Sequence, residues 1–151
     1  MVQLAVESHP LQRQIAVKIV IDSYAWIEHL LGTEKGSKID IILKNADEVY
    51  TPDTVLAEIA RKFVREGVDV KTVNEWLAQI VNASNIVCLE SKLAIIAAQC
   101  YLEIEANARK SKLNLPSLFD AIVLAISRSL NSKVLTGDQH FKELPETIWV
   151  G

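Results

Sequence analysis

The sequence predicts an α/β fold, a three-layer α/β/α domain with a mainly parallel sheet between two layers of helices. Short apolar runs typical of strands alternate along the chain with segments that have helical periodicity, and this alternation is typical of parallel sheets covered on both faces. The chain has 151 residues, 50% of them hydrophobic, which suits one domain with a sizeable core. Right-handed crossovers between strands would place residues 18–21 and 134–135 in the same sheet.

The first half of the chain is predicted to begin with a buried strand, because the β-branched run AVKIVID ends in an acid. The segment LGTEKGSK carries two glycines and is predicted as a turn. Pro52 suits a first helical turn, with Thr51 as its N-cap. The predicted elements are strand 16–22, helix 23–31, helix 39–46, strand 48–52, helix 54–67 and helix 70–83.

The second half repeats the alternation. The segment LNLP separates a long helical pattern from a strongly apolar one, and the run KVLTGD is predicted as a strand that ends in an acid. The predicted elements are strand 85–90, helix 91–113, helix 117–130, strand 133–138, a helical turn at 139–144 and strand 146–151. Residues 1–15 fit no element and are predicted to be an N-terminal arm or extension to a domain spanning 16–151.

Composition excludes some classes of protein. A net charge of -3 argues against a passive nucleic-acid coat, although clustered acids would lower the total charge of an RNA enzyme too. Cys88 and Cys100 lie in apolar stretches and are expected to be buried, reduced thiols. No apolar run approaches the length of a membrane span, and the first residues do not resemble a signal peptide. The sequence therefore predicts a cytoplasmic protein without a membrane partner.

Four acids stand where apolar runs stop: Asp22, Glu58, Asp120 and Asp138. Asp22 and Asp138 close predicted parallel strands, whose carboxyl ends form the ligand crevices of α/β folds. Carboxylates converging there, with no histidine or cysteine ligand predicted beside them, would hold Mg²⁺ or Mn²⁺ rather than zinc. Two such ions about 3.5–4 Å apart can activate water and steady the leaving oxygen in phosphodiester cleavage.

Each acid also has a plainer interpretation. Asp120 with Ser117 fits a capping box, and Asp22 and Asp138 could cap the helical segments that follow them. Glu58 and Lys62 are spaced to pair across a helical turn. Capping also uses Ser, Thr and Asn, however, so it does not require four acids, whereas metal-dependent cleavage does. Ser23 and Thr136 could hydrogen-bond a ligand carboxylate or a metal-bound water, or could act as caps.

The segments IVIDSYAWIE, TVLAEIARK, LFDAIVLAIS and VLTGDQHF, in this order, resemble the PIN-domain ribonucleases, with the VapC-type toxins of toxin–antitoxin pairs as the group most similar. The resemblance covers residues 17–150. It implies that Asp22, Glu58, Asp120 and Asp138 occupy the four metal-ligand positions of the family. It also implies hydroxyl residues at 23 and 136, a homodimer, and an antitoxin that occludes the site. His140 falls where the family varies and is assigned no role.

Other residues are weaker candidates. Two basic clusters flank the acids in sequence and could hold RNA phosphates, or could be solvated faces: Arg61, Lys62 and Arg65, and Arg109, Lys110 and Lys112. Tyr24, Trp26 and Trp76 could stack on bases, although core packing suits Trp26 better. The histidines show no metal-ligand spacing.

The functional prediction is a divalent-metal endoribonuclease that is the toxin of a toxin–antitoxin pair. An RNA-processing or maturation nuclease of the same fold, acting without an antitoxin, is the alternative enzyme. A non-catalytic PIN-like interaction module is the alternative from another class, although it would tolerate loss of acids and none is lost. A receiver domain would need a second acid beside Asp22, and a haloacid-dehalogenase phosphatase would need an acid at Tyr24.

Overall fold

The sheet is parallel throughout the part of the chain that the structure describes. The computed structural model describes residues 15–151, and its five strands have the order β3-β2-β1-β4-β5 with every neighbouring pair parallel. The strands are β1 (Lys18–Ile21), β2 (Glu48–Pro52), β3 (Asn85–Val87), β4 (Lys133–Thr136) and β5 (Thr147–Trp149). Val20 of β1 pairs with Val134 of β4, so the prediction that these two segments share a sheet is confirmed.

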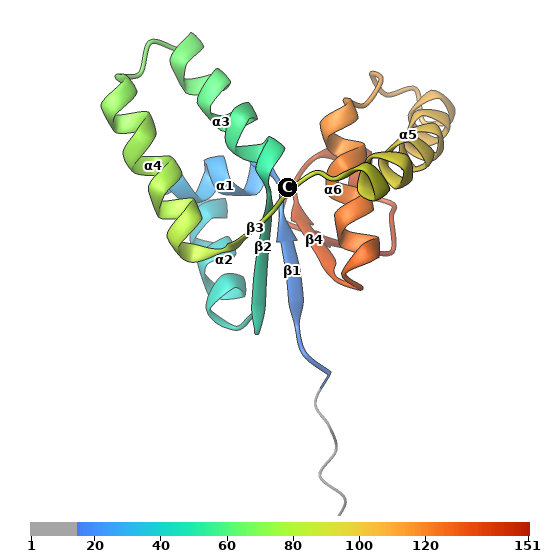
Figure 1. Ribbon diagram of the computed structural model, residues 1–151, viewed down its shortest axis with the longest axis horizontal. Coiled ribbons are helices and arrows are strands. Elements are labelled where there is room, and N and C mark those ends of the chain that lie inside the picture. The colour runs from blue at the N-terminus through green and yellow to red at the C-terminus, as the bar shows by residue number, and fades with distance from the viewer. Residues whose placement is uncertain (1–14) are drawn as a thin grey trace, which may run out of the picture.

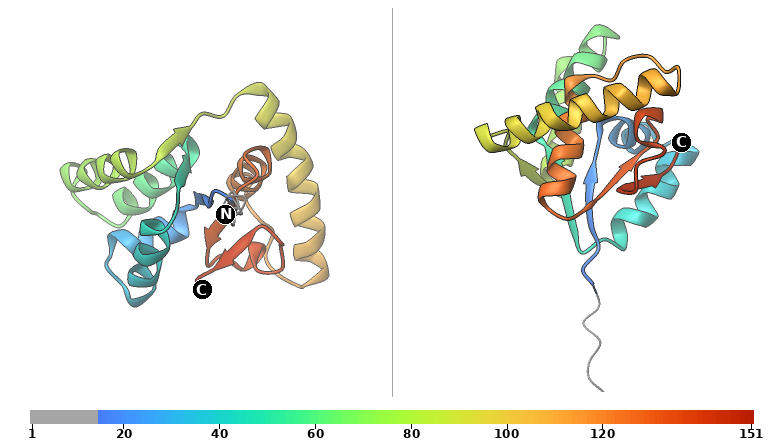
Figure 2. Two further views of the ribbon diagram at one scale, coloured as in Figure 1. Left: turned by 90° about the horizontal axis from the view of Figure 1, so that it is seen from below. Right: turned by 90° about the vertical axis from the view of Figure 1, so that its right-hand side faces the viewer.

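Helices cover both faces of this sheet. They are α1 (Ser23–Leu30), α2 (Glu34–Lys44), α3 (Asp53–Arg65), α4 (Val70–Ala83), α5 (Ser91–Lys110), α6 (Leu118–Ser129) and the short 3₁₀ turn η1 (Gln139–Phe141). Figure 1 shows α1 to α4 on one side of the strands and α5 and α6 on the other, and the view from below in Figure 2 shows the same separation. The predicted α/β/α fold is confirmed.

The core explains which strands lie at the centre. Residues 19–21 of β1 and Val134 and Leu135 of β4 are fully buried. Helix α6 is buried from Ala121 to Ser127 because it packs against the sheet on one side and against α5 on the other. Trp26 is also buried and donates from Nε1 to Thr51 Oγ1 at 3.0 Å, which confirms its predicted role in the core.

Two local predictions are wrong. Helix α2 begins at Glu34, inside the predicted turn, with Thr33 accepting a capping hydrogen bond from Gly36 N at 3.0 Å. A Cβ atom on Gly36 would lie 2.3 Å from Glu28 O, so this glycine is needed for the close packing of α2 on α1. Thr51 is not an N-cap; it lies in the buried part of β2, and Pro52 occupies the cap position without a side-chain bond.

The prediction that both thiols are buried is also corrected. Both cysteines are free, Cys100 is buried in α5, and Cys88 is exposed. Cys88 follows β3, an edge strand that ends at Val87, so the chain has left the sheet before the thiol. The arm predicted for residues 1–15 lies, except for Ile15, outside the described residues, and the domain start at residue 16 stays a prediction. No helix among residues 15–151 combines the length and the apolar character needed to cross a membrane.

Candidate functional site

The site lies where the strand order reverses. From β1 the chain proceeds to β2 and β3 on one side, whereas β4 and β5 lie on the other side of β1. The helices that connect the strands therefore leave from opposite faces at the carboxyl ends of β1 and β4, the position at which open α/β sheets form ligand crevices. Asp22 follows β1 directly, and Gly137 and Asp138 follow β4.

Thr136 joins Asp22 to Asp138. The Thr136 hydroxyl donates to Asp22 Oδ2, and its oxygen accepts from Asp138 N at 2.9 Å. Asp22 is only 5% exposed, and its other oxygen accepts from Ala25 N at 2.9 Å as the N-cap of α1. The buried Thr136 hydroxyl thus holds the Asp22 carboxylate, which follows β1, in a fixed position relative to the backbone of Asp138, which follows β4.

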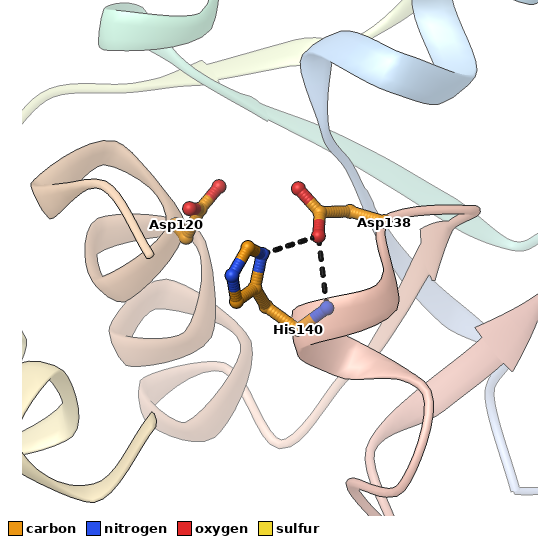
Figure 3. A group of neighbouring side chains, drawn as sticks. All are labelled: Asp120, Asp138 and His140. Carbon is orange, nitrogen blue, oxygen red and sulfur yellow. Dashed lines mark hydrogen bonds and ion pairs between the residues drawn. The ribbon is translucent and has the colours of Figure 1, made fainter. Parts of the chain in front are cut away.

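Asp120 approaches Asp138 from α6, which covers the face of the sheet opposite α1 to α4. Its backbone and side chain form the predicted capping box at the start of α6, in which Asp120 Oδ2 accepts from Ser117 N at 2.7 Å. Ligand atoms of Asp120, Asp138 and His140 all lie within 4.8 Å of one another, and Figure 3 shows the two carboxylates facing each other beside the imidazole. Asp120 can therefore cap α6 and also take part in the site, because the capping box uses its Oδ2 and not its Oδ1.

His140 belongs to this cluster, although no role is predicted for it from the sequence. Its Nδ1 lies 2.7 Å from Asp138 Oδ1, and its Nε2 lies 2.6 Å from the carbonyl oxygen of Asn114. Both neighbours can act as acceptors, an arrangement that favours the protonated ring, in which both nitrogens donate. Burial opposes that charge, but the bonds to Asn114 and Asp138 and the charges of Asp138 and Asp120 outweigh it and raise the pKa of His140.

A short-range signal for this role was present in the sequence. An aspartate that caps a turn and a histidine two residues later can bond through their side chains, as Asp138 and His140 do. The contact with Asn114 could not be foreseen, because it joins the turn after β4 to the loop before α6.

Glu58 approaches the cluster from α3 and feels the charges of Asp120 and Asp138, but it is not among the residues whose ligand atoms lie within 4.8 Å of one another. It is half-buried, and burial together with the charges of Asp120 and Asp138 raises its pKa to about 7, against the opposing effects of Arg61 and of a hydrogen bond from Ser23. It does not pair with Lys62, which instead binds Glu66 Oε1 at 2.5 Å. Glu58 is therefore turned toward the other acids rather than toward its own helix.

Burial of several acids at one place has an electrostatic cost. Burial, with smaller contributions from Asp138 and Asp120, raises the pKa of Asp22 to about 7 despite its two hydrogen bonds. The pKa of Asp120 is raised as well, first by burial and then by Asp138. Like charges and desolvation both disfavour ionisation, so a cation bound among these groups would be strongly favoured.

The donors suit a hard divalent cation. Carboxylate oxygens of Asp120 and Asp138 lie close enough to share an ion, with Asp22 and Glu58 as further acids around them. Oxygen donors of this kind fit Mg²⁺ or Mn²⁺. His140 is a poor ligand in this arrangement, since both of its nitrogens are engaged as donors.

The predicted basic residues are distributed unevenly. Arg61 is near enough to Glu58 to lower its pKa, whereas Arg109 pairs with Glu105 at 2.9 Å along α5. Lys110 lines a cavity of about 600 Å³ that opens beside the acids between the end of α5 and η1, together with Gln139, His140 and Lys142. Lys112, two residues beyond the last residue of α5, has a φ of 58° and is not among the residues that line this cavity.

Comparison with known proteins gives a family match. The family model described as the PIN domain matches residues 19–147, a range that includes all four acids. No curated protein matches the sequence.

Solved structures resemble the chain over most of its length. VapBC2 from Rickettsia felis bound to a promoter DNA fragment has a TM-score of 0.62 at 15% identity, covering 88% of this chain and 97% of that one. VapC20 from Mycobacterium tuberculosis, described as a toxin that cleaves the sarcin–ricin loop, has a TM-score of 0.63 at 16% identity, with 84% and 95% covered. DNA-bound VapBC from Salmonella typhimurium gives 0.63 at 12%, with 89% and 99% covered. At these identities the likeness establishes the fold.

Proposed function

This chain belongs to the PIN-domain family, and on that basis we propose that it is an endoribonuclease that hydrolyses RNA phosphodiester bonds with Mg²⁺ or Mn²⁺. One observation carries the proposal: Asp120 and Asp138 meet within 4.8 Å at the carboxyl edge of the sheet, where burial and, to a smaller extent, the charges of these two acids raise the pKa values of Asp22 and Glu58. This crowding of acids is unfavourable in the free protein and suits a site that binds cations.

All four acids would act as ligands of the ion. Asp22, Glu58, Asp120 and Asp138 are the proposed ligands, and Ser23 and Thr136 orient Glu58 and Asp22 by hydrogen bonds. When bound, the divalent ion supplies a Lewis acid that activates water and neutralises charge on the phosphoryl oxygens. Positively charged His140 holds Asp138 in place and adds a cation beside the phosphate. Arg61, which is close enough to Glu58 to lower its pKa, and Lys110, which lines the cavity with His140, are the proposed contacts to flanking phosphates. Lys62 and Arg109 are paired with Glu66 and Glu105, so they and Lys112 are weaker candidates.

The chemistry predicts the cleavage products. Water is the proposed nucleophile and the 2′-hydroxyl takes no part, so cleavage leaves a 5′-phosphate and a 3′-hydroxyl. Analysis of the RNA ends after cleavage would test this step, and a 2′,3′-cyclic phosphate as the first product would contradict it.

The proposed biological role is that of the toxin in a toxin–antitoxin pair. The fold is shared with VapC20 and with the VapBC assemblies, and the chain covers nearly the whole length of those structures. We propose an antitoxin protein that occludes the acids, a homodimer, and action on RNA in the cytoplasm. A neighbouring reading frame for a small DNA-binding protein would separate this role from that of an RNA-processing nuclease.

Asp120→Asn tests the site directly. This change removes the charge but keeps an oxygen that can accept from Ser117 N, so the helix cap survives. We expect metal-dependent cleavage of structured RNA to fall by at least about a hundred-fold, since loss of a group that only supports a metal ligand costs ~10–100-fold. The melting temperature without metal should be unchanged or higher, because one buried like charge is gone.

The matched control is Glu75→Gln, the same loss of charge at an exposed position on α4. This variant should cleave RNA at the wild-type rate. Cleavage by Asp120→Asn at the wild-type rate would remove Asp120 from the mechanism, and metal-independent cleavage by the wild type would overturn the proposal as a whole.

A further inference from the structure

The backbone of Gly137 is in direct contact with the aromatic ring of Tyr24. Gly137 separates Thr136, the last residue of β4, from Asp138, and Tyr24 lies in the first turn of α1, two residues after Asp22. A Cβ atom on Gly137 would lie 2.3 Å from Cε1, 2.5 Å from Cζ and 2.9 Å from the hydroxyl oxygen of Tyr24. The three nearest atoms all belong to this one side chain, so only glycine fits against the ring at position 137.

Lys35 holds the far end of this ring. Its Nζ donates to the Tyr24 hydroxyl at 2.8 Å and lies 5.6 Å from the ring centroid. Lys35 is in the first turn of α2, next to Gly36, where the backbones of α2 and α1 come close together. The Thr33 hydroxyl, which caps α2, also bonds to Glu28 of α1. The ammonium group that binds Tyr24 therefore projects from a helix that is itself fixed to α1.

Asp22 and Asp138 are joined in two ways as a result. Thr136 joins them by hydrogen bonds, since its hydroxyl donates to Asp22 Oδ2 and accepts from Asp138 N at 2.9 Å. Tyr24 joins them by packing, since it follows Asp22 by two residues and touches Gly137, the residue before Asp138. A hydrogen bond limits how far two groups can separate, whereas a ring in close contact limits how near they can approach. Together the two contacts fix the spacing of these acids.

This spacing matters for a metal ion. Mg²⁺ requires near-ideal octahedral geometry, with oxygen ligands at about 2.0–2.1 Å. Carboxylates without a bound ion repel one another, so they do not keep such a spacing unaided. Groups that orient metal ligands without touching the ion change metal affinity or activity by ~10–100-fold.

We propose that Tyr24, held by Lys35, is a positioning residue that sets the place of Asp138 relative to Asp22 for binding of the divalent ion. This inference rests on the proposed metal-dependent function and adds two residues that are neither ligands nor hydrogen-bond partners of ligands. Tyr24 acts through the backbone of Gly137 and touches neither the ion nor the substrate. It should therefore govern the metal affinity of the site more than the rate of cleavage once the ion is bound.

The first test is Mn²⁺ binding by Tyr24 variants, measured by isothermal titration calorimetry without RNA. Tyr24→Leu stays apolar but lacks all three atoms that touch Gly137, and we expect the Mn²⁺ dissociation constant to rise about ten-fold. Tyr24→Phe keeps Cε1 and Cζ and should retain most of the affinity. Tyr101→Leu removes a half-buried tyrosine of α5, the matched control, and should bind Mn²⁺ as the wild type does. A ring that served only the stability of the fold would lower the melting temperature and leave the dissociation constant unchanged.

RNA cleavage gives a second readout of the same variants. The Mn²⁺ concentration that gives half-maximal cleavage should rise about ten-fold in Tyr24→Leu. The rate at saturating Mn²⁺ should stay close to that of the wild type, because the bound ion itself draws the carboxylates together. A lower rate at saturating Mn²⁺ with an unchanged half-maximal concentration would contradict a positioning role.

Gly137→Ala tests the contact itself. The added methyl group would meet the ring, so this single change should also weaken Mn²⁺ binding. In the Tyr24→Leu background those ring atoms are absent, and the same methyl group should have little further effect. Changes at residues in contact are non-additive, whereas independent changes add. Additive losses in the double variant would show that the ring does not act through Gly137.

Lys35→Met makes the test independent of the folding of Tyr24→Leu. It keeps an unbranched side chain but removes the donor to the Tyr24 hydroxyl, and we expect a smaller loss of Mn²⁺ affinity than in Tyr24→Leu. The direction is diagnostic, because losing a positive charge removes repulsion and cannot by itself weaken the binding of a cation. Lys38→Met, an exposed lysine one turn further along α2, is the matched control. If Tyr24→Leu does not fold, unchanged Mn²⁺ affinity in both Lys35→Met and Gly137→Ala would overturn the inference.

The outcomes separate this inference from the proposed function. A wild type that binds Mn²⁺ and cleaves RNA, with normal Mn²⁺ binding in Tyr24→Leu, leaves the ribonuclease assignment standing and removes Tyr24 from positioning. Weaker Mn²⁺ binding by Tyr24→Leu and not by Tyr101→Leu supports the inference, even where RNA is not cleaved. A wild type that does not bind Mn²⁺ overturns both.

Discussion

At the scale of single residues, the acids have two roles at once. Asp22 caps α1 and accepts from Thr136, Asp120 closes the capping box of α6, and Asp138 caps η1. The same hydrogen bonds hold the carboxylates in fixed positions close to one another. Capping and metal binding, which the sequence presents as alternatives, are therefore compatible in this structure.

The raised pKa of Asp22 makes the stability of the metal-free protein depend on pH. The folded protein holds the proton up to about pH 7, whereas the unfolded chain releases it near the ordinary value of 3.8. Between these values the folded state binds more protons, so this contribution to stability is full below about pH 4 and is lost as pH rises through about 7. A pKa that differs by one between the folded and unfolded states corresponds to about 1.4 kcal/mol of stability.

We therefore expect the melting temperature in EDTA to be higher near pH 5 than near pH 8. Glu58 contributes in the same direction, since its pKa is also raised to about 7. Asp22→Asn should remove the contribution of Asp22 and leave that of Glu58, so the dependence becomes weaker without disappearing, and Glu75→Gln should leave it unchanged. Thermal unfolding followed by circular dichroism gives the measurement, and a melting temperature that rises from pH 5 to pH 8 in the wild type would contradict the prediction.

At the scale of elements, helix starts position the site. Asp120 stands in the first turn of α6, and Ser117 fixes that turn by accepting from Asp120 N at 3.2 Å. Helix α2 has an equivalent cap at Thr33, on the other face of the sheet from α6. The two caps are similar in chemistry and differ in their distance from the acids.

Ser117→Ala and Thr33→Ala should therefore differ in their effect on activity. Each change removes a capping hydroxyl and should cost about 1 kcal/mol of stability. Only Ser117→Ala should also slow RNA cleavage, because it loosens the turn that carries Asp120. Chemical denaturation and cleavage rates measured on both variants test this, and equal activity in the two would show that the cap does not position Asp120.

At the scale of the whole molecule, two groups of helices bring the site together. Glu58 comes from α3 on one face of the sheet and Asp120 from α6 on the other, while Asp22 and Asp138 lie just beyond the carboxyl ends of β1 and β4. Arg128 fixes α6 to its surroundings through a two-pronged pair with Glu103 of α5, at 2.6 and 3.0 Å, and a bond to Glu146 at 2.8 Å. An ion held by all of these elements would stabilise the whole fold.

Saturating Mn²⁺ should accordingly raise the melting temperature of the wild type. A ligand that binds only the folded state at 100 times its dissociation constant adds about 2.7 kcal/mol. The increase should be much smaller in Asp120→Asn and unchanged in Glu75→Gln. Differential scanning fluorimetry with Mn²⁺ and with EDTA measures it, and an interaction module without a metal site would show no difference between the two conditions.

The sequence by itself determined the order of strands and helices and the types of residue at the strand ends. The periodicity of apolar residues is a local property, so it gave all five strands and the capping box at Ser117 and Asp120. Only the tertiary structure decided three other features. Gly36 lies in α2 rather than in a turn, because α2 packs closely on α1 at this residue. Thr51 lies in the core beside Trp26, and the carbonyl of Asn114 contacts His140. These contacts join segments that are distant in sequence or packed side by side, and a local pattern does not encode such distances.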